Sequence, residues 1–251
     1  MRELLSNLDH FDAILTLAAV RIGHSKIGDE MTLPRQLAIP LAQSQIDAAA
    51  KFWFEGAWEA KEFEELKGAF ADPAHAISIK AIVVNALYGT NIFAIDKVAA
   101  CIERVVKSTR SAGPDLVEEL VVEIRQITKR NNYSFASKYA HFFLDSTVPI
   151  LDWYAEWTLG KHLGQLRSSN PKRYHKFFEE IDLLKDLAGI ECQCAAMDAY
   201  LWVAGEYLHW KGNSTARING DLKRQFERIH LDPTCDAALV SLLGSILAPP
   251  E

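Results

Sequence analysis

The sequence contains few cysteines, glycines and prolines, which excludes several specialised classes of protein. The four cysteines among its 251 residues are Cys101, Cys192, Cys194 and Cys235. The C-x-C pair is weak evidence for a metal site because two further nearby ligands are missing. Thirteen glycines and nine prolines are too few for a fibrous or low-complexity protein. The odd spacing of the cysteines and the lack of a signal peptide favour free thiols in a reducing cytoplasm, and we expect no bound metal.

Long apolar runs and an excess of basic residues are lacking as well. No apolar stretch near the start is long enough to span a membrane, so we expect a soluble protein with no membrane partner. The net charge of −6 argues against a general polyanion binder. A local basic patch is nevertheless enough for DNA. Two basic clusters are present, Lys172, Arg173 and Lys176, and Arg217, Lys223, Arg224 and Arg228. Either cluster alone also fits a solvated helix face.

The strict alternation of apolar and polar residues that is typical of strands does not recur in the sequence. Helical spacing dominates instead, beginning with the stripe Leu4, Leu8, Phe11 and Leu15. We predict an all-α protein. The expected helices span residues 44–70, 73–88, 91–106, 116–127, 139–144, 152–164, 171–188, 191–210, 219–229 and 233–247.

We predict that residues 1–251 form a single compact unit, because no linker, repeat or low-complexity stretch interrupts the chain. Within it, residues 1–72 form an N-terminal helical extension, 73–150 a core lobe and 151–251 a C-terminal set of helices. The helix that follows Asp72, with Pro73 at its first position, is apolar nearly all round. We expect this helix at the centre of the core.

Residues 130–154, RNNYSFASKYAHFFLDSTVPILDWY, carry the strongest chemical signal. Tyr133–Ser137 is predicted to be a tight connection, which puts Lys138 near the N-terminus of the next helix. A helix N-terminus destabilises an ammonium and favours the neutral, nucleophilic amine. Asp152, fourteen residues later, is predicted to cap another helix. The residues alone also fit a surface lysine and a purely capping aspartate.

The same region resembles the helix-hairpin-helix DNA glycosylase superfamily. Tyr133–Ala140, YSFASKYA, is similar to that family's hairpin L-P-G-V-G-x-K-T-A, and Lys138 falls on the catalytic lysine. Val148–Asp152, VPILD, is similar to the run that ends in the catalytic aspartate. Two departures are Ser134 and Ala136, which replace the hairpin glycines, and the short Lys-to-Asp spacing. The iron–sulfur cysteines of one branch are absent.

Two further stretches extend the resemblance over roughly residues 75–210. Ile82–Ile102 is similar to the family's entry helices, and its Tyr88–Asn91 falls where the family inserts residues at the flipped base. Asp198–Gly205, DAYLWVAG, is similar to a C-terminal helix near the base pocket. The stretches occur in the family's order, which is what makes them informative together.

The resemblance implies a two-lobed helical fold with a DNA-binding cleft between the lobes. It implies a DNA N-glycosylase that acts on a damaged or modified base flipped out of double-stranded DNA. Asp152 would stabilise the oxocarbenium-like sugar, and Lys138 would attack the sugar in an enzyme with lyase activity. Such an enzyme needs no cofactor, is expected as a monomer, and serves in base-excision repair or in antiviral defence against phages with modified bases.

The residues expected to form the base pocket or to bind DNA are those predicted to lie near Lys138 and Asp152 or near the flipped base. They are Tyr88, Asn91, Ser134, Ala136, Ser137, His141, Trp153, Asp198 and Trp202. Further aromatic candidates are Trp53, Trp58, Tyr154 and Trp210. Two other interpretations stay open: a DNA-binding or interaction protein that keeps the fold without the chemistry, and an all-helical scaffold unrelated to DNA. A hydrogen-bonded core histidine also explains His141.

Overall fold

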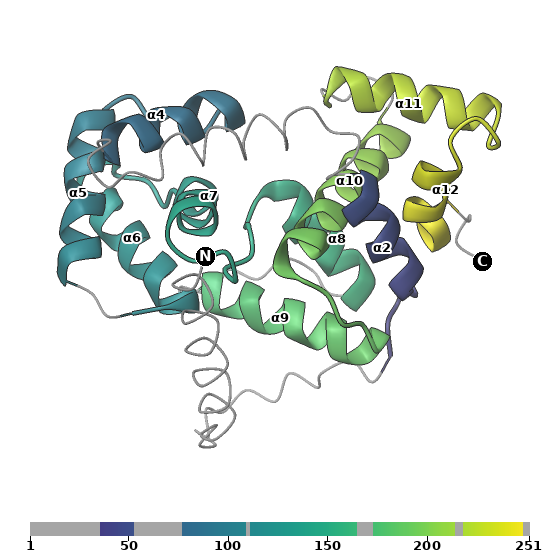
Figure 1. The fold of residues 1–251 in the computed structure, drawn as a ribbon, viewed down its shortest axis with the longest axis horizontal. Coiled ribbons are helices and arrows are strands. Elements are labelled where there is room, and N and C mark those ends of the chain that lie inside the picture. Colours follow the sequence, from purple (N-terminus) through teal and green to yellow (C-terminus); the bar gives the residue numbers. More distant parts are fainter. Residues whose placement is uncertain (1–35, 53–76, 109–110, 165–172, 214–217, 248–251) are drawn as a thin grey trace, which may run out of the picture. The chain divides into compact units, whose positions relative to one another are not determined.

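The computed structural model describes residues 36–52, 77–108, 111–164, 173–213 and 218–247 (Figure 1). These residues form helices and connecting segments, with no strand among them, which confirms the all-α prediction for this part of the chain. All of them belong to one unit, Pro34–Glu251. No helix in the described ranges is both long and apolar enough to cross a membrane. The apolar stripe from Leu4 to Leu15, Trp53, Trp58 and the Asp72–Pro73 cap lie outside the described residues.

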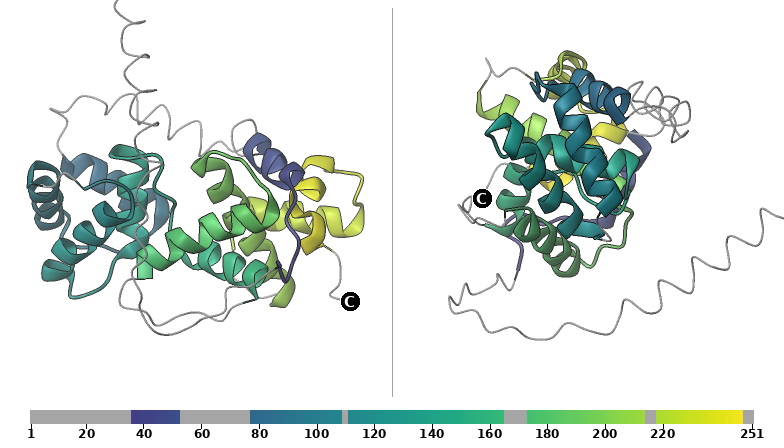
Figure 2. Two further views of the ribbon diagram at one scale, coloured as in Figure 1. Left: turned by 90° about the horizontal axis from the view of Figure 1, so that it is seen from below. Right: turned by 90° about the vertical axis from the view of Figure 1, so that its left-hand side faces the viewer.

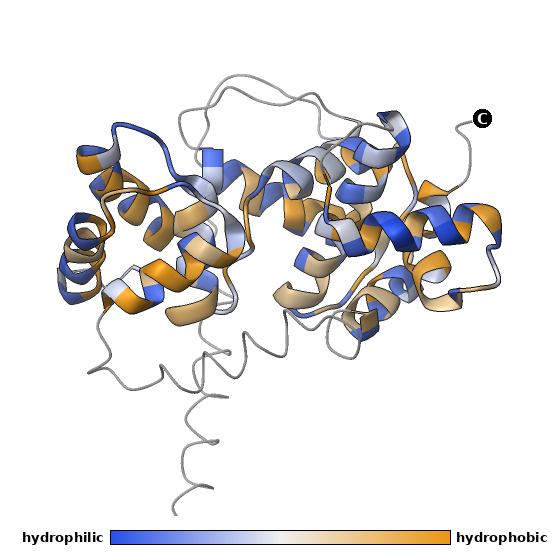
Figure 3. Ribbon diagram, turned by 90° about the horizontal axis from the view of Figure 1, so that it is seen from above, coloured by the Kyte–Doolittle hydropathy of each residue, from blue (hydrophilic) through white to orange (hydrophobic). Residues whose placement is uncertain are grey.

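The helices agree with the predicted ones to within a few residues at most ends. They are α2 (Gln43–Lys51), α4 (Ile77–Tyr88), α5 (Ile95–Ser108), α6 (Gly113–Thr128), α7 (Tyr133–Phe143), α8 (Trp153–Leu163), α9 (Arg173–Ala188), α10 (Cys194–Gly212), α11 (Gly220–Leu231) and α12 (Ala237–Leu243), followed by the 3₁₀ turn η2 (Gly244–Ile246). Figure 3 shows hydrophobic and hydrophilic patches that change every few residues along most helices. This pattern is expected for helices that turn one face to a core.

The helices pack in two groups that α9 connects (Figures 1 and 2). In the first, α4 packs on α5 and α7, and α6 packs on α5 and α7. In the second, α10 packs on α8, α2 and α11, and α2 also packs on α12. Helix α9 contacts α6 in the first group and α8 in the second. Segments far apart in the sequence, such as α2 and α12, are therefore neighbours.

The prediction that the apolar helix after Pro73 forms the centre of the core is wrong for its described part, α4. Only Ala81 and Val84 of α4 are buried, whereas Ile82 is 50% exposed and Leu87 45% exposed. Helix α10 contributes most to the core instead, with buried residues on all its faces. Apolar composition does not reveal how many neighbours surround a helix, and α10 has more of them than α4.

The tight connection before Lys138 lies earlier than predicted. Helix α6 ends at Thr128, and Lys129 takes a left-handed conformation with φ of 59°. The turn therefore spans residues 129–132, and α7 begins at Tyr133 because the Ala136 N–H donates to the Asn132 carbonyl. Lys138 is the sixth residue of α7 and lies beyond its first turn. The prediction that a helix N-terminus acts on its amine is therefore wrong.

Helix α5 also begins later than its predicted start at Asn91. Residues 89–94 form a loop, and the Asn85 side chain bonds both backbone groups of Ile92 within it. Its Oδ1 accepts the Ile92 N–H at 2.8 Å, and its Nδ2 donates to the Ile92 carbonyl at 3.0 Å. Asn91 has a φ of 56°, which a helix does not allow. A side chain that satisfies backbone groups in this way competes with the helix.

His162 on α8 links three parts of the second group from a fully buried position. Its Nδ1 lies 2.8 Å from the Ile39 carbonyl, which can only accept, so Nδ1 donates and Nε2 accepts from the Tyr200 hydroxyl at 2.8 Å. Burial lowers the pKa of His162, although the bond to Ile39 opposes this. The neutral imidazole is thus the form that the fold stabilises.

We predict that His162 makes the protein less stable in mild acid. In the unfolded chain the pKa of histidine is about 6.5, so the unfolded state binds the proton first as the pH falls. The free energy of unfolding should drop as the pH falls below that value, and it should drop more steeply than in His162→Gln. Urea unfolding at about pH 7.5 and about pH 5.5 measures this. Equal pH slopes for the two proteins would contradict it.

Candidate functional site

Lys138 and Asp152 meet at one place although they belong to different helices. The Lys138 Nζ lies 3.3 Å from Asp152 Oδ2 and donates to Ser134 Oγ at 3.0 Å. The lysine side chain is only 6% exposed, and its ammonium lies 5.2 Å from the ring centre of Tyr88. Burial of an ion pair costs free energy unless further partners stabilise the charges. Here the Ser134 hydroxyl accepts a hydrogen bond from the ammonium, and the Tyr88 ring provides a cation–π contact.

Asp152 is held in place by the start of α8. Its Oδ1 accepts the Ala155 N–H at 2.9 Å, which makes it the N-cap of that helix, and its Oδ2 remains for Lys138. An ionised carboxylate is favoured at a helix N-terminus, where backbone N–H groups and the helix dipole face it. The predicted capping role of Asp152 is confirmed, and the same position aims its second oxygen at the lysine.

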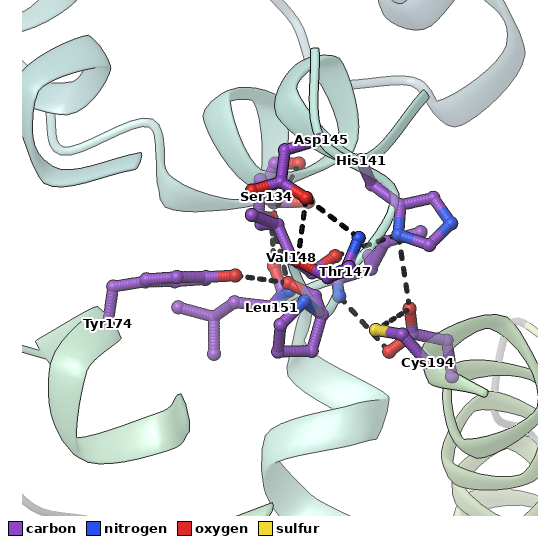
Figure 4. A network of polar contacts seen from close by, with 12 residues as sticks. Ser134, His141, Asp145, Thr147, Val148, Leu151, Tyr174 and Cys194 are labelled. Carbon is purple, nitrogen blue, oxygen red and sulfur yellow. Dashed lines mark hydrogen bonds and ion pairs between the residues drawn. The ribbon is translucent and has the colours of Figure 1, made fainter. Parts of the chain in front are cut away.

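The segment that leads into Asp152 is fixed by side chains on three helices (Figure 4). The backbone groups of Val148, Pro149, Ile150 and Leu151 are bonded by His141, Tyr174, Asp198 and Ser137, respectively. His141 and Ser137 come from α7, Tyr174 from α9 and Asp198 from α10. Four consecutive residues thus have their backbone positions set from outside, which leaves Asp152 little freedom to move.

Lys138 and Asp152 both line a pocket of about 570 Å³. This volume lies within the range of roughly 300–1,000 Å³ that is usual for small-molecule sites. Its aromatic lining is Tyr88, Phe142, Trp153, Tyr154 and Trp202, and its polar lining is Ser134, Lys138, His141, Asp152, Asp198, Glu206 and Asn219. Flat aromatic walls beside a few polar groups suit a planar heteroaromatic ligand.

Two acidic side chains on α10 line the pocket beyond Asp152. Burial raises the pKa of Asp198 to about 8, while hydrogen bonds from the Ile150 N–H and the Cys194 thiol act in the opposite direction. Asp198 is therefore mostly protonated at neutral pH and can donate a hydrogen bond. Glu206 is 4% exposed and accepts the Asn219 N–H at 3.1 Å. Burial, together with Glu206 and Asp152, raises the pKa of Tyr154 to about 12.

The structure gathers most of the predicted pocket residues around the pair. Tyr88, Ser134, His141, Trp153, Asp198 and Trp202 all line the same pocket as Lys138 and Asp152. Three others lie elsewhere. Ala136 is fully buried with its N–H donated to the Asn132 carbonyl, and Ser137 is buried against the Leu151 backbone. Asn91 is exposed in the 89–94 loop with its amide bonded to Gly89.

Glu206 and Asn219 line the pocket but are not among the predicted residues. A sequence signal existed for Glu206. Asp198, Trp202 and Glu206 are four residues apart along α10, a spacing that places side chains on one face of a helix. Asn219 offered no comparable signal, because its place depends on how the chain returns from α10 to α11.

Comparison with known proteins gives two matches. A family model described as HI_0787_N, N-terminal domain, matches residues 55–147, a range that includes α4 to α7 and Lys138 but ends before Asp152. An uncharacterized protein of Haemophilus influenzae is 30% identical over 140 residues, which are 53% of this chain and 67% of the relative. No solved structure matches the chain.

Proposed function

Because the chain belongs to the same family as the Haemophilus influenzae protein, which is itself uncharacterized, we propose its function from the pocket: a DNA N-glycosylase. The observation that carries this proposal is the Lys138–Asp152 pair, 3.3 Å apart, at the wall of an aromatic-lined pocket. The resemblance to helix-hairpin-helix glycosylases gives the pair its roles. In this proposal the two packing groups of helices act as lobes, with the bound DNA between them.

The pocket has the chemistry that removal of a flipped base requires. A base taken out of the duplex loses its stacking, and the rings of Tyr88, Trp153 and Trp202 can replace it. As the bond between C1′ and the base nitrogen breaks, its electron pair leaves with the base and positive charge develops on the sugar. The fixed carboxylate of Asp152 stabilises that charge.

Lys138 acts as the nucleophile in the lyase form of the reaction. Its ammonium first gives up a proton, which becomes available to the departing base. The neutral Nζ then forms a bond to C1′, and opening of the sugar ring at O4′, which takes up a proton, leaves an imine. Without this step, the lysine acts as a fixed positive charge and water attacks C1′.

DNA contacts are proposed at the turn between α6 and α7. Lys129 and Arg130 are exposed in this turn, directly before the N-terminus of α7, and Ser134 in the first turn of α7 lines the pocket. Free N–H groups at a helix start, beside basic side chains, favour a phosphate. Ala136 has no part in this contact because its N–H already donates to the Asn132 carbonyl.

Phe93 is expected to support base flipping from outside the pocket. Phe93 is 93% exposed in the 89–94 loop, which follows the pocket residues Leu87 and Tyr88. The Asn85 side chain binds this loop through two hydrogen bonds to the Ile92 backbone. An apolar side chain of this kind can enter a base stack. Phe93→Ala should lower excision from a paired duplex about tenfold and excision from single strands much less.

A matched control for Phe93 is Leu231, which is 89% exposed at the end of α11. Leu231→Ala should leave excision from both substrates unchanged. Single-turnover excision rates for the three proteins on paired and single-stranded substrates decide the matter. A uniform loss on both substrates would contradict a role for Phe93 in flipping.

The proposed function itself is tested with a panel of duplexes that carry damaged or modified bases. Base release is read by strand cleavage after heating in alkali, and borohydride trapping on an abasic duplex tests the bond to Lys138. We expect release of at least one base and loss of the trapped adduct in Lys138→Gln. Salt-dependent DNA binding without release of any base would instead identify a DNA-binding protein that lacks the chemistry.

A further inference from the structure

In the wall of the pocket that Lys138 and Asp152 line, three side chains with metal-binding atoms converge on one point. They are His141 on α7 and Cys194 and Asp198 on α10. Their ligand atoms all lie within 4.8 Å of one another. We infer that His141, Cys194 and Asp198 form a binding site for a zinc-type transition-metal ion, which the sequence did not predict.

The spacing of the three groups fits tetrahedral coordination. His141 Nδ1 lies 3.7 Å from Asp198 Oδ2, and Cys194 Sγ lies 3.6 Å from the same oxygen. Bonds of roughly 2.0–2.3 Å to a tetrahedral zinc ion put its ligand atoms roughly 3.3–3.8 Å apart. Both distances therefore match the edges of such a site. The third edge, between His141 Nδ1 and Cys194 Sγ, is no longer than 4.8 Å, so a side-chain movement of at most about 1 Å completes the geometry. Figure 4 shows the His141 ring and the Cys194 sulfur on either side of this point.

The donor set selects the class of metal. An imidazole, a thiolate and a carboxylate suit Zn²⁺ or a related first-row ion, whereas Mg²⁺ and Ca²⁺ require oxygen ligands. Three protein ligands leave a fourth position for water or another oxygen. The groups are also buried enough for a cation to matter, because Asp198 is 8% exposed and His141 7% exposed. A cation would compensate the cost of keeping a carboxylate out of water.

Binding changes the protonation of three groups. Asp198, which is mostly protonated at neutral pH, gives up its proton to solvent and binds through a carboxylate oxygen. His141 Nδ1 now donates to the Val148 carbonyl at 2.7 Å, so ligation through Nδ1 moves the ring proton to Nε2 and gives up this bond. The Cys194 thiol releases its proton to solvent and binds as the thiolate. Burial, with nearby Asp198, raises the pKa of Cys194, so the bond from sulfur to the metal has to overcome that preference.

An ion at this point would join α7 to α10 at the wall of the pocket, which His141 and Asp198 both line. His141 follows Lys138 by less than one turn of α7, and Asp198 holds the Ile150 N–H two residues before Asp152. The metal would thus fix Lys138 relative to Asp152, because it would bind α7, which carries Lys138, and Asp198, which holds the segment before Asp152. This inference does not depend on the glycosylase proposal, because metal binding is measured without any substrate.

Cobalt titration of the full-length protein, first stripped of metal with a chelator, tests the site. Co²⁺ in a tetrahedral site with a thiolate ligand should give visible d–d bands and a near-ultraviolet charge-transfer band, and added Zn²⁺ should remove both. Cys194→Ala should abolish the charge-transfer band. Cys192→Ala, two residues earlier on the same segment, should retain it at full intensity.

Two results would overturn the inference. One is the absence of both kinds of band in the wild-type protein at several-fold excess of Co²⁺. The other is a band that survives Cys194→Ala and disappears in Cys192→Ala. Asp198→Asn, which keeps an oxygen for the Ile150 N–H, provides a second variant if Cys194→Ala does not fold. Circular dichroism checks the fold of each variant, and Asp198→Asn should weaken Co²⁺ binding at least tenfold.

Discussion

Asp152→Asn is expected to slow base excision about 100- to 1,000-fold while the fold and DNA affinity stay nearly unchanged. The amide oxygen of asparagine can still accept the Ala155 N–H, so the cap of α8 is kept. What is lost is the negative charge 3.3 Å from the Lys138 ammonium, which is the charge that would stabilise the developing sugar cation. Single-turnover excision kinetics at saturating protein separate this loss from weaker binding.

Asp236 provides a matched control for this substitution. It caps α12 in the same way, with its carboxylate accepting the Leu239 N–H at 2.9 Å, and it does not line the pocket. Asp236→Asn should therefore excise at the wild-type rate. Equal rates for Asp152→Asn and the wild type would reduce Asp152 to a helix cap and remove the basis of the proposed chemistry.

The helical fold was predictable from the sequence because it follows from local patterns. The apolar spacing and the capping residues locate α6 and the helices from α8 to α12 to within a few residues, apart from the start of α10 and both ends of α12. The position of Lys138 within α7 was not predictable in this way. Its misplacement came from interpreting Tyr133–Ser137 as a connection, whereas the left-handed Lys129 ends α6 four residues before Tyr133.

The pairing of Lys138 with Asp152 was predictable only through the order of motifs that the resemblance supplied. No periodicity links a residue in the middle of α7 to the cap of α8. Their contact depends on the segment between them, which side chains from α7, α9 and α10 hold. Such long-range bonds cannot be read from spacing, so the sequence did not indicate that His141, Cys194 and Asp198 converge.

The close packing of α8 against α10 leads to the largest expected effect on stability. Gly205 lies in the middle of α10, where a Cβ atom would be 2.7 Å from both the Cβ and the carbonyl oxygen of Tyr154 and 2.8 Å from Thr158 Oγ1. A backbone carbonyl cannot move aside as the end of a flexible side chain can. Gly205→Ala should therefore lower the free energy of unfolding by about 1–3 kcal/mol, as overpacked cores do.

The sign of this effect separates tertiary packing from helix propensity. Alanine is favoured over glycine by about 1 kcal/mol inside a helix, so propensity alone predicts that Gly205→Ala stabilises the protein. A methyl group at Gly212, at the end of the same helix, would meet no neighbouring atom within 4 Å, and Gly212→Ala should be neutral or slightly stabilising. Urea unfolding of both variants measures the difference. If both substitutions stabilised the protein, α8 and α10 would not be in the contact that positions Tyr154 and Asp152 at the pocket.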